Sequence, residues 1–375
     1  MDTGHVRAIA FYLPQFHPIP ENDGWWGKGF TEWTNVARAR PLFSGHYQPH
    51  VPADLGFYDL RLPEARLAQA ELAAAYGLEG FCYWHYWFHG RRLLERPFNE
   101  VLASGAPDFP FCLAWANESW SRRWLGEARD VLLQQAYSPA DDLDHIRWLL
   151  PAFADPRYVR IGGRPLFLVY RPNDLPDAPR TTDLWRAECV RHGLPEPYLL
   201  ATNSHSADLD CRRLGFDSTL AFKPELSVLP YFMQDGLLLR KLRTNLYYGV
   251  PSARLKIYNY HAVQATMMAM QRLHPMVPCV MVGWDNTPRR GANAIVVADS
   301  NQLVFEQTLS SAIQSVQSLA PEERLVFVNA WNEWAEGNHL EPDYRYGHRF
   351  LEAVRRANLA DVRSPAPERI AQPAA

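Results

Sequence analysis

Two glutamates with a short, fixed spacing are the residues of this chain best suited to acid–base chemistry. Glu333 and Glu336 lie in segment 332–337, which reads NEWAEG. In a turn or a helical start, this spacing places both side chains on one face. Burial beside Trp331 and Trp334, together with mutual repulsion, would raise the pKa of one carboxyl. Cleavage of a glycosidic bond requires two such unequal carboxyl groups. The structural alternative is that Glu336 caps the next segment or pairs with an arginine.

A second Asn-Glu dipeptide offers a rival arrangement. Asn117 and Glu118 follow an apolar run, just as Asn332 and Glu333 do. This dipeptide at a strand end is typical of retaining glycosidases, in which the asparagine positions a sugar hydroxyl beside the acid. Glu118 could therefore pair with Glu333 across a barrel, or it could form an ion pair with Arg122 or Arg123. We favour substrate binding or a supporting role for Glu118.

The histidines and remaining acids do not indicate a metal or cofactor. His85 and His89 are four residues apart but follow an aromatic run rather than an amphipathic helix, and no His-Glu-x-x-His occurs. We expect no metal and no cofactor, and we assign His85 to hydrogen bonding with sugar hydroxyls. Asp285 could orient a substrate hydroxyl or cap its own turn. The Asp-x-Asp match at 208–210, a possible diphosphate-sugar signature, lies in a poorly defined region.

Composition narrows the class of ligand. The 375 residues carry a formal net charge of -3, which gives no field that favours nucleic acid or an anionic membrane. The chain has 13 Trp and 17 Tyr, and such rings stack on sugars or fill an aromatic-rich core. The 5 cysteines are scattered and form no CxxC pair, which argues against a disulfide framework and a zinc site. We therefore expect a carbohydrate partner, and no protein partner is evident.

The two ends of the chain and its hydropathy bear on location. Segment 1–5 leads directly into an apolar run, without the basic and apolar regions of a signal peptide. No window approaches the roughly 20 apolar residues of a membrane span. We expect a cytoplasmic protein with one catalytic domain over residues 1–363. Residues 364–375, rich in Pro and Ala, are expected to be a disordered tail.

Strand-like runs alternate with helical patterns along the whole chain. The predicted strands are Val6–Leu13, Gly80–Trp84, Phe109–Trp115, Pro165–Tyr170, Tyr198–Thr202, Ser218–Phe222, Val277–Val282 and Leu325–Ala330. The predicted helices are Pro63–Tyr76, Pro139–Phe153, Thr182–His192, Leu255–Leu273, Gln302–Leu319 and Tyr346–Leu359. This alternation predicts an α/β fold, a (β/α)8 TIM barrel. An open doubly wound sheet is the alternative, but no Gly-x-Gly-x-x-Gly follows the first strand.

Long loops follow the first and sixth predicted strands, at 14–62 and 223–254. In a barrel these loops and all strand ends meet at the C-terminal face, where catalytic residues gather. Polar and aromatic residues occur at these positions with unusual regularity. The residues predicted to bind substrate are Gln15, His17, Trp25, Trp26, Trp33, Tyr83, His85, Trp87, Asn117, Glu118, Trp120, Trp284, Asp285, Asn332 and Trp334.

Several longer motifs together resemble one family. They are YLPQFH at 12–17, WWGKGFTEWTN at 25–35, HYQPH at 46–50, GFCYWHYWF at 80–88, CLAWANESW at 112–120, WDNTPR at 284–289 and NAWNEWAEGNHLEP at 329–342. These stretches span nearly the whole chain. They resemble the glycoside hydrolase family 99-like proteins, which are often described as glycosyltransferases of lipopolysaccharide or O-antigen biosynthesis in bacteria.

The resemblance implies a mechanism for the glutamate pair. Family 99 proper contains endo-acting α-mannosidases on a (β/α)8 barrel with a Glu-x-x-Glu pair. One glutamate removes the proton of the sugar 2-hydroxyl to give a 1,2-anhydro intermediate with net retention, and the other is the general acid. On this chain Glu333 would be the base and Glu336 the acid. The reaction requires a 2-hydroxyl trans to the leaving group, as in α-mannosides and α-rhamnosides.

Three functions follow as hypotheses. The first is a retaining glycoside hydrolase acting on a bacterial poly- or oligosaccharide through Glu333 and Glu336. The second is a glycosyltransferase of lipopolysaccharide or O-antigen biosynthesis, which would bind a nucleotide sugar. The third is a barrel that binds glycans without catalysis.

Overall fold

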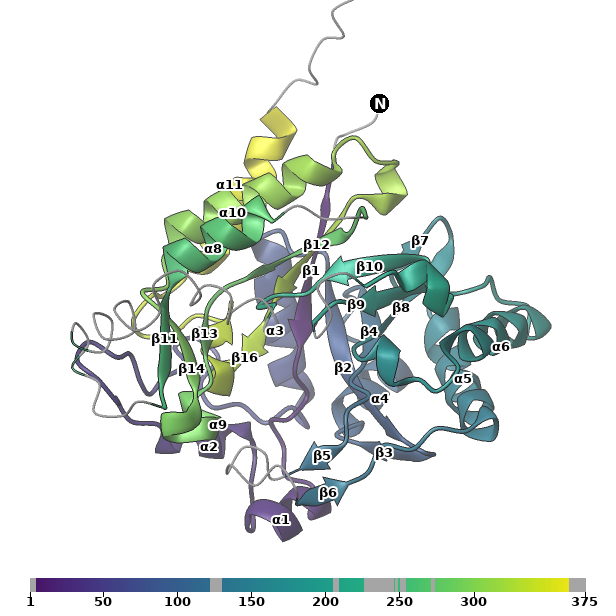
Figure 1. The fold of residues 1–375 in the computed structure, drawn as a ribbon, viewed down its shortest axis with the longest axis horizontal. Coiled ribbons are helices and arrows are strands. Elements are labelled where there is room, and N and C mark those ends of the chain that lie inside the picture. Colours follow the sequence, from purple (N-terminus) through teal and green to yellow (C-terminus); the bar gives the residue numbers. More distant parts are fainter. Residues whose placement is uncertain are drawn as a thin grey trace, which may run out of the picture.

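The chain forms a closed barrel of parallel strands with helices outside it (Figure 1). The computed structural model describes residues 5–121, 130–204, 209–225, 246, 249, 254–270 and 274–363. Strand β1 (Arg7–Tyr12) closes the barrel, because it pairs in parallel with β15 on one side and with β2 on the other. The predicted (β/α)8 fold is therefore confirmed.

The barrel strands follow one another around the barrel in chain order. After β1 they are β2 (Gly80–Phe88), β4 (Phe111–Trp115), β8 (Arg164–Val169), β9 (Tyr198–Thr202), β10 (Ser218–Ala221), β12 (Val277–Met281) and β15 (Leu325–Asn329). Each coincides with a predicted strand to within a few residues. The main difference is β2, which continues beyond Trp84 to Phe88 and carries the short antiparallel strand β3 (Arg91–Leu93). Nearly all barrel residues are buried, which explains their continuous apolar runs.

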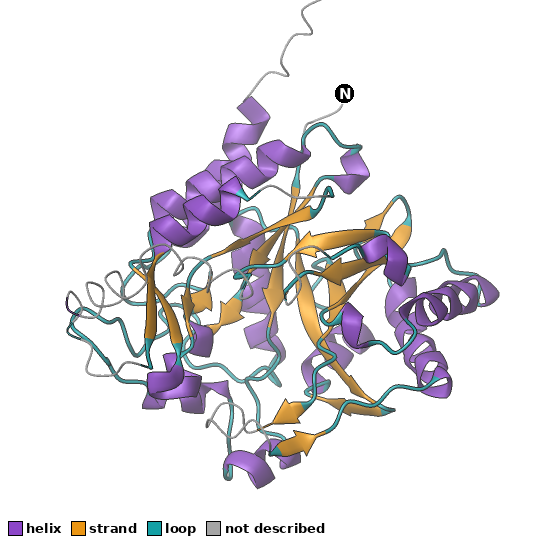
Figure 2. Cartoon of the chain, viewed as in Figure 1, coloured by secondary structure: helices purple, strands orange, loops and turns teal. Residues whose placement is uncertain are grey.

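Helices cover the outside of the barrel (Figure 2). They are α3 (Pro63–Ala75), α4 (Arg96–Ser104), α5 (Pro139–Ala154), α6 (Ala178–Arg191), α8 (Tyr260–Ala269), α10 (Gln302–Val316) and α11 (Arg349–Arg363). Their ends carry the expected signals. Ser138 caps α5 by accepting a hydrogen bond from the backbone of Asp141, and Asn301 caps α10 in the same way.

One helix prediction is wrong in its first part. We predicted a continuous helix over Leu255–Leu273, but Lys256–Asn259 form strand β11 and the helix begins only at Tyr260. Strand β11 pairs with β14 (Ile295–Ala298), so a distant partner overrides the local preference. Asn259 then accepts a hydrogen bond from the backbone of Ala262 and starts α8. Residues 271–273 lie outside the described residues.

Elements at the C-terminal end of the barrel build the surroundings of a site. The first loop, defined as residues 14–62, contains α1 (Pro20–Trp26) and α2 (Glu32–Arg38). The other elements at this end are β5 (Trp120–Ser121), β6 (Val131–Leu133), β13 (Trp284–Asp285), α9 (Thr287–Arg290), β16 (Asn332–Glu333) and β17 (Asn338–His339). Most of the long connection predicted at 223–254, and all of the predicted tail at 364–375, lie outside the described residues.

Aromatic rings fill the barrel at this same end. Phe11 stacks on Trp84 with 4.9 Å between ring centroids and contacts Phe222 edge-on at 5.3 Å. Tyr170 contacts Trp84 at 5.4 Å and Phe222 at 5.5 Å. Edge-to-face contacts of this kind hold the rings rigidly. They make a firm aromatic floor below the C-terminal loops.

The helices themselves show nothing that would cross a bilayer. Among the described residues, none of them combines the length and the apolar content of a membrane-spanning helix.

The close approach of β2 to the start of β4 gives a test of the barrel register. A Cβ at Gly80 would lie 2.8 Å from the carbonyl oxygen of Pro110, which accepts a hydrogen bond from the backbone of Phe81. We expect Gly80→Ala to lower the free energy of unfolding by about 1–3 kcal/mol, as overpacking does. Urea denaturation measures this. Gly24→Ala is the control because no atom lies within 4 Å of the added Cβ, and an equal loss in both variants would contradict the register.

Candidate active site

A cavity of about 410 Å3 lies above the aromatic floor. Trp84, Tyr170 and Phe222 of the floor line it, and Trp26, Trp120 and Trp284 form its walls. Its polar groups are Gln15, Glu118, Arg171, Asp174, Arg289, Asn329, Glu333 and Glu336. The side-chain nitrogen of Gln15 is buried without a hydrogen-bond partner. Aromatic walls with a few convergent polar groups are the usual form of a small-molecule site.

One arginine holds three carboxylates on one side of this cavity. Arg289 of α9 donates from Nε to Glu32 at 2.6 Å and from Nη2 to Glu333 at 3.1 Å. It also donates from Nη1 to Glu336. Glu32 is fully buried, and within the described part of the chain its second oxygen has no hydrogen-bond partner. One guanidinium cannot neutralise three buried carboxylates, so a proton on one of them is favoured.

The ionisation of this cluster follows from burial. Desolvation, and secondarily the charge of Glu336, raises the pKa of Glu333 to about 8. Burial also raises the pKa of Glu336, although Arg289 opposes the shift. Burial works against the charge of Arg289, yet Glu32, Glu336 and Glu333 together raise its pKa above the ordinary value. The two glutamates therefore hold a proton near neutral pH, which is the requirement for a general acid.

A short hairpin places the two glutamates. Glu333 lies on β16, which pairs antiparallel with β17, and Glu336 ends the 3-10 turn between the two strands. The Asn332 side chain accepts from the backbone N–H of Leu13 at 2.7 Å and donates to its carbonyl at 3.0 Å. Asn338 accepts from the backbone of Val282 at 3.1 Å. The hairpin is thus fastened to the ends of β1 and β12.

The cavity brings together part of the predicted set. The predicted residues that line it are Gln15, Trp26, Glu118, Trp120, Trp284, Glu333 and Glu336. They come from the first loop and from the ends of the third, seventh and eighth barrel strands. This distribution fits the convergence of strand ends that a barrel imposes.

Strand β2 turns its predicted residues away from the cavity. Side chains alternate along a strand, and Trp84 and Tyr86 face the cavity. Tyr83 instead packs on Tyr12, with 4.4 Å between ring centroids. His85 faces outward as well, 2.9 Å from the buried His145.

Trp87 follows the same outward alternation. Its indole donates to Asp141 at 3.0 Å and its ring stacks on His145. The aromatic-rich run 80–88 shows no alternation of polar and apolar residues that would indicate the inward face.

Other predicted residues support the cavity from behind. Trp33 donates to the carbonyl of Tyr58 at 2.8 Å, and Trp334 donates to Glu341. His17 contacts the carbonyl of Pro14 at 3.1 Å. The remaining member of this group is Trp25, whose ring contacts Trp120 edge-on at 5.7 Å.

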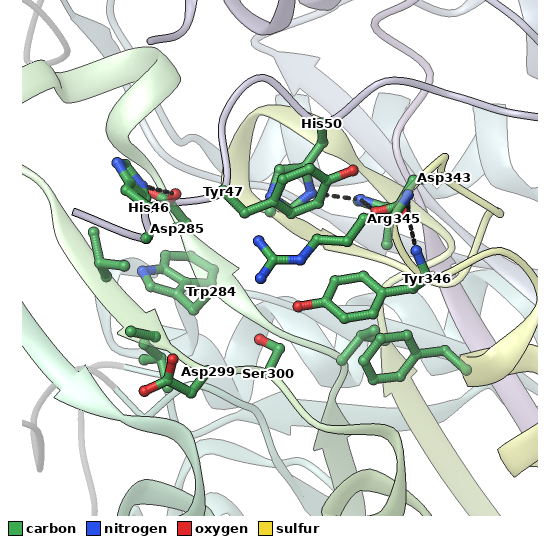
Figure 3. Close-up of a pocket in the computed structure, with 18 of the residues that line it drawn as sticks. His46, Tyr47, His50, Trp284, Asp285, Asp299, Ser300, Asp343, Arg345 and Tyr346 are labelled. Carbon is green, nitrogen blue, oxygen red and sulfur yellow. Dashed lines mark hydrogen bonds and ion pairs between the residues drawn. The ribbon is translucent and has the colours of Figure 1, made fainter. Parts of the chain in front are cut away.

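Asp285 lies at a neighbouring cavity, shown in Figure 3. It binds His46 and Gln48 of the first loop, each at 2.7 Å. It also accepts from the backbone of Thr287 at 2.9 Å. The turn-capping alternative is therefore what the structure shows for Asp285.

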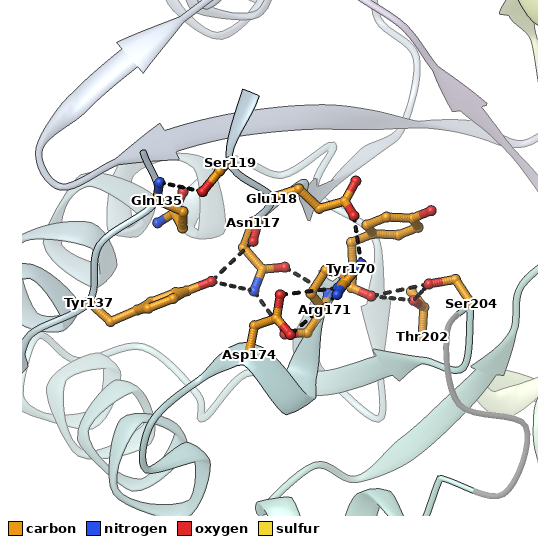
Figure 4. Close-up of polar contacts among 10 residues, drawn as sticks. All are labelled: Asn117, Glu118, Ser119, Gln135, Tyr137, Tyr170, Arg171, Asp174, Thr202 and Ser204. Carbon is orange, nitrogen blue, oxygen red and sulfur yellow. Dashed lines mark hydrogen bonds and ion pairs between the residues drawn. The ribbon is translucent and has the colours of Figure 1, made fainter. Parts of the chain in front are cut away.

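The Asn117-Glu118 dipeptide lies beside Arg171 and Asp174 (Figure 4), and Glu118, Arg171 and Asp174 line the cavity. Glu118 forms an ion pair with Arg171 at 2.7 Å, and Arg171 also binds Asp174 at 3.1 Å. Asn117 is fully buried and holds both backbone groups of Arg171, at 2.7 and 2.9 Å. Arg122 and Arg123 lie outside the described residues. Asn117 therefore shapes this wall, while Glu118 reaches the cavity.

Glu32 and Arg289 are the functional residues that the sequence reasoning missed. Arg289 stood within the motif at 284–289, but nothing in its spacing indicated a contact with Glu336. Glu32 lies some 250 positions away in the chain, so only the folded first loop brings it to Arg289. The one available signal was the acidic residue inside the aromatic segment 25–35.

The fold defines the class to which this barrel belongs. The GH99 endo-α-mannosidase of Bacteroides thetaiotaomicron superposes with a TM-score of 0.56 and 16% identity, over 95% of this chain and 97% of that chain. A protein described as glycoside hydrolase-like gives a TM-score of 0.56 at 14% identity, over 94% of each chain. The fold is that of the GH99 barrels.

The family is shown by the sequence comparisons. The family model described as "Glycosyltransferase WbsX" matches residues 8–354, and the chain belongs to this family. It is 44% identical over 358 residues to the uncharacterized protein WxcX of Xanthomonas campestris pv. campestris strain B100. The same identity holds for WxcX of strain ATCC 33913. The alignment covers 95% of this chain but 50% of WxcX, so the chain spans about half the length of these curated relatives.

The buried proton predicts a pH dependence of stability. Because the folded-state pKa of Glu333 is raised to about 8 from 4.5, its contribution is fully present below pH 4.5 and is lost as the pH rises through 8. We expect the free energy of unfolding to fall between pH 5 and 8, by at most about 1.4 kcal/mol per pH unit from this group. Glu333→Gln should flatten the slope and be the more stable protein at pH 8. Urea denaturation across this range measures both slopes, and equal slopes would contradict a buried proton on Glu333.

Proposed function

We propose that this protein is a retaining glycoside hydrolase that acts on a bacterial poly- or oligosaccharide of α-manno or α-rhamno configuration. The observation that carries the proposal is the pair of the buried Glu333 and the partly exposed Glu336, which lie side by side on Arg289 in an aromatic cavity. A carboxylate pair with raised pKa values supplies an acid and a base at neutral pH. The indole walls suit the apolar faces of sugar rings.

The proposed reaction proceeds in two balanced steps. In the first, one glutamate takes the proton of the sugar 2-hydroxyl while O2 attacks C1. The bond from C1 to the leaving oxygen breaks, and the other glutamate gives that oxygen a proton. In the second step, water attacks C1 of the 1,2-anhydro sugar and loses a proton to the former acid, while O2 regains its proton from the former base. Two inversions at C1 give net retention.

The two glutamates require a decision on roles. The family resemblance gives Glu333 the base role and Glu336 the acid role. The unliganded cavity favours the proton on Glu333, because Glu336 has the closer contact with Arg289. Both assignments need one proton on the pair, and neighbouring carboxyls that interact strongly titrate as a unit. We propose Glu333 as base and Glu336 as acid, with the proton passing to Glu336 when the sugar is bound.

Leaving-group dependence tests the roles directly. After a glycan screen has found a substrate, Glu333→Gln and Glu336→Gln are each assayed on an alkyl glycoside and on the glycosyl fluoride of the same sugar. Fluoride leaves without protonation, so Glu336→Gln should recover on the fluoride to within about tenfold of wild type. Glu333→Gln should lose about 100-fold or more on both substrates. Recovery of Glu333→Gln alone would reverse the roles.

Controls separate catalysis from binding and from transfer. Asp174→Asn makes the same acid-to-amide change at another residue that lines the cavity, and its rate should fall far less than that of either glutamine variant. Near wild-type rates in both glutamine variants would refute the proposal.

The family description favours a second candidate, a glycosyltransferase. Isothermal titration with nucleotide diphosphate sugars tests it: tight binding supports a transferase, and saccharide binding without turnover supports a non-catalytic barrel.

A further inference from the structure

The neighbouring cavity has a volume of about 290 Å3 and shares Trp284 with the catalytic cavity. Three buried side chains at its wall, His50, His339 and Asp343, bring one ligand atom each to within 4.8 Å of the others. Figure 3 shows His50 and Asp343 close together at the upper side of this cavity, with Asp299 at its lower edge. No step of the proposed reaction uses these three residues.

The imidazole of His339 presents a lone pair to this cluster. Its Nδ1 lies 2.9 Å from the carbonyl oxygen of Glu341, which can only accept, so Nδ1 carries the proton. A neutral imidazole carries one N–H, so with the proton on Nδ1 the Nε2 atom has a free lone pair. This Nε2 lies 2.8 Å from Nδ1 of His50. A histidine that donates one N–H to a carbonyl while its other nitrogen faces inward has the usual orientation of a metal ligand.

The carboxylate of Asp343 is a second feature of this cluster that points to a bound cation. One of its oxygens, Oδ1, accepts from the backbone N–H groups of Arg345 at 3.0 Å and Tyr346 at 2.6 Å. The other, Oδ2, is buried without a hydrogen-bond partner among the described residues and lies 3.8 Å from Nε2 of His339, and the Tyr47 hydroxyl also interacts with this carboxylate. A buried carboxylate oxygen without a partner is costly, and a cation removes that cost.

We propose that His50, His339 and Asp343 bind a divalent transition-metal ion, of which Zn2+ is the representative. Two imidazoles and one carboxylate suit zinc, with the cavity leaving space for water at the remaining position. Without the ion, Nδ1–H of His50 donates to His339. Binding moves the His50 proton to Nε2, which frees Nδ1 as a ligand without a change in charge.

The position of the ion defines its effect on the molecule. His339 pairs with Asn332 across the hairpin that carries Glu333, and the ring of Trp334 stacks on His339 at 3.8 Å. His50 belongs to the first loop. The ion would therefore tie this loop to the hairpin and stabilise the folded state in proportion to its occupancy. This role is structural and does not depend on the proposed hydrolase activity.

Zinc alone is the probe for this site. Protein freed of metal with a chelator and dialysed is titrated with ZnCl2, and bound zinc is measured by mass spectrometry alongside the melting temperature. We expect one ion per chain and a higher melting temperature. Asp343→Asn keeps the Oδ1 contacts but loses the charge. This variant and the separate variant His50→Gln should each weaken zinc binding by at least about 100-fold.

Asp299→Asn is the matched control, because it makes the same change in the same cavity outside the cluster. Asp299 has a φ of 64°, a conformation that asparagine adopts readily, so this variant should fold and bind zinc like wild type. Equal loss in Asp299→Asn and Asp343→Asn would overturn the proposal. If the cluster variants fail to fold, the titration of the wild-type protein decides the question. Binding of less than one equivalent of zinc would overturn the proposal, and the cluster would then be only a hydrogen bond between His50 and His339.

Discussion

The arrangement of the C-terminal face of the barrel depends on one guanidinium, that of Arg289, which faces three carboxylates. Arg289 is enclosed, and its partners Glu32, Glu333 and Glu336 lie in the first loop and in the last hairpin. A cluster with more acids than bases in a poorly solvated place favours the uptake of a proton. The raised pKa of Glu333 is the direct result. The same imbalance makes the folding of this cluster costly.

That cost explains how firmly the surrounding segments are fastened. The side chains of Asn332 and Asn338 accept hydrogen bonds from backbone N–H groups just past the ends of β1 and β12. These bonds hold the hairpin in the position that keeps Glu333 against Arg289. Behind the hairpin, Glu341 accepts from Tyr58, Gln69 and Trp334. Desolvation raises the pKa of Glu341 to about 7, and the hydrogen bonds from these neutral donors oppose that shift. Glu333 and Glu336 thus contact a cation, whereas Glu341 contacts neutral hydrogen-bond donors.

The barrel could be predicted from the sequence because its strands are local, continuous apolar runs between turn signals. The site could be predicted only where its residues are neighbours in the sequence, as Glu333 and Glu336 are. Trp84 and Tyr86 were not distinguished from Tyr83 and His85, since an all-aromatic strand hides its alternation. The contact of Glu32 with Arg289 was beyond reach, because it forms only when a loop near the start of the chain folds over α9.

The hairpin also connects the two cavities, because its residues alternate between them. Glu333 and Glu336 face the cavity above the aromatic floor, whereas His339 faces the neighbouring one. Between them, Gly337 adopts a φ of 57°, and a Cβ there would lie 3.0 Å from the Cβ of Asp285. The turn is therefore closely packed against β13, whose Trp284 lines both cavities. A shift of the hairpin toward either cavity must move a wall of the other, so the contacts of His339 and those of Glu333 constrain each other.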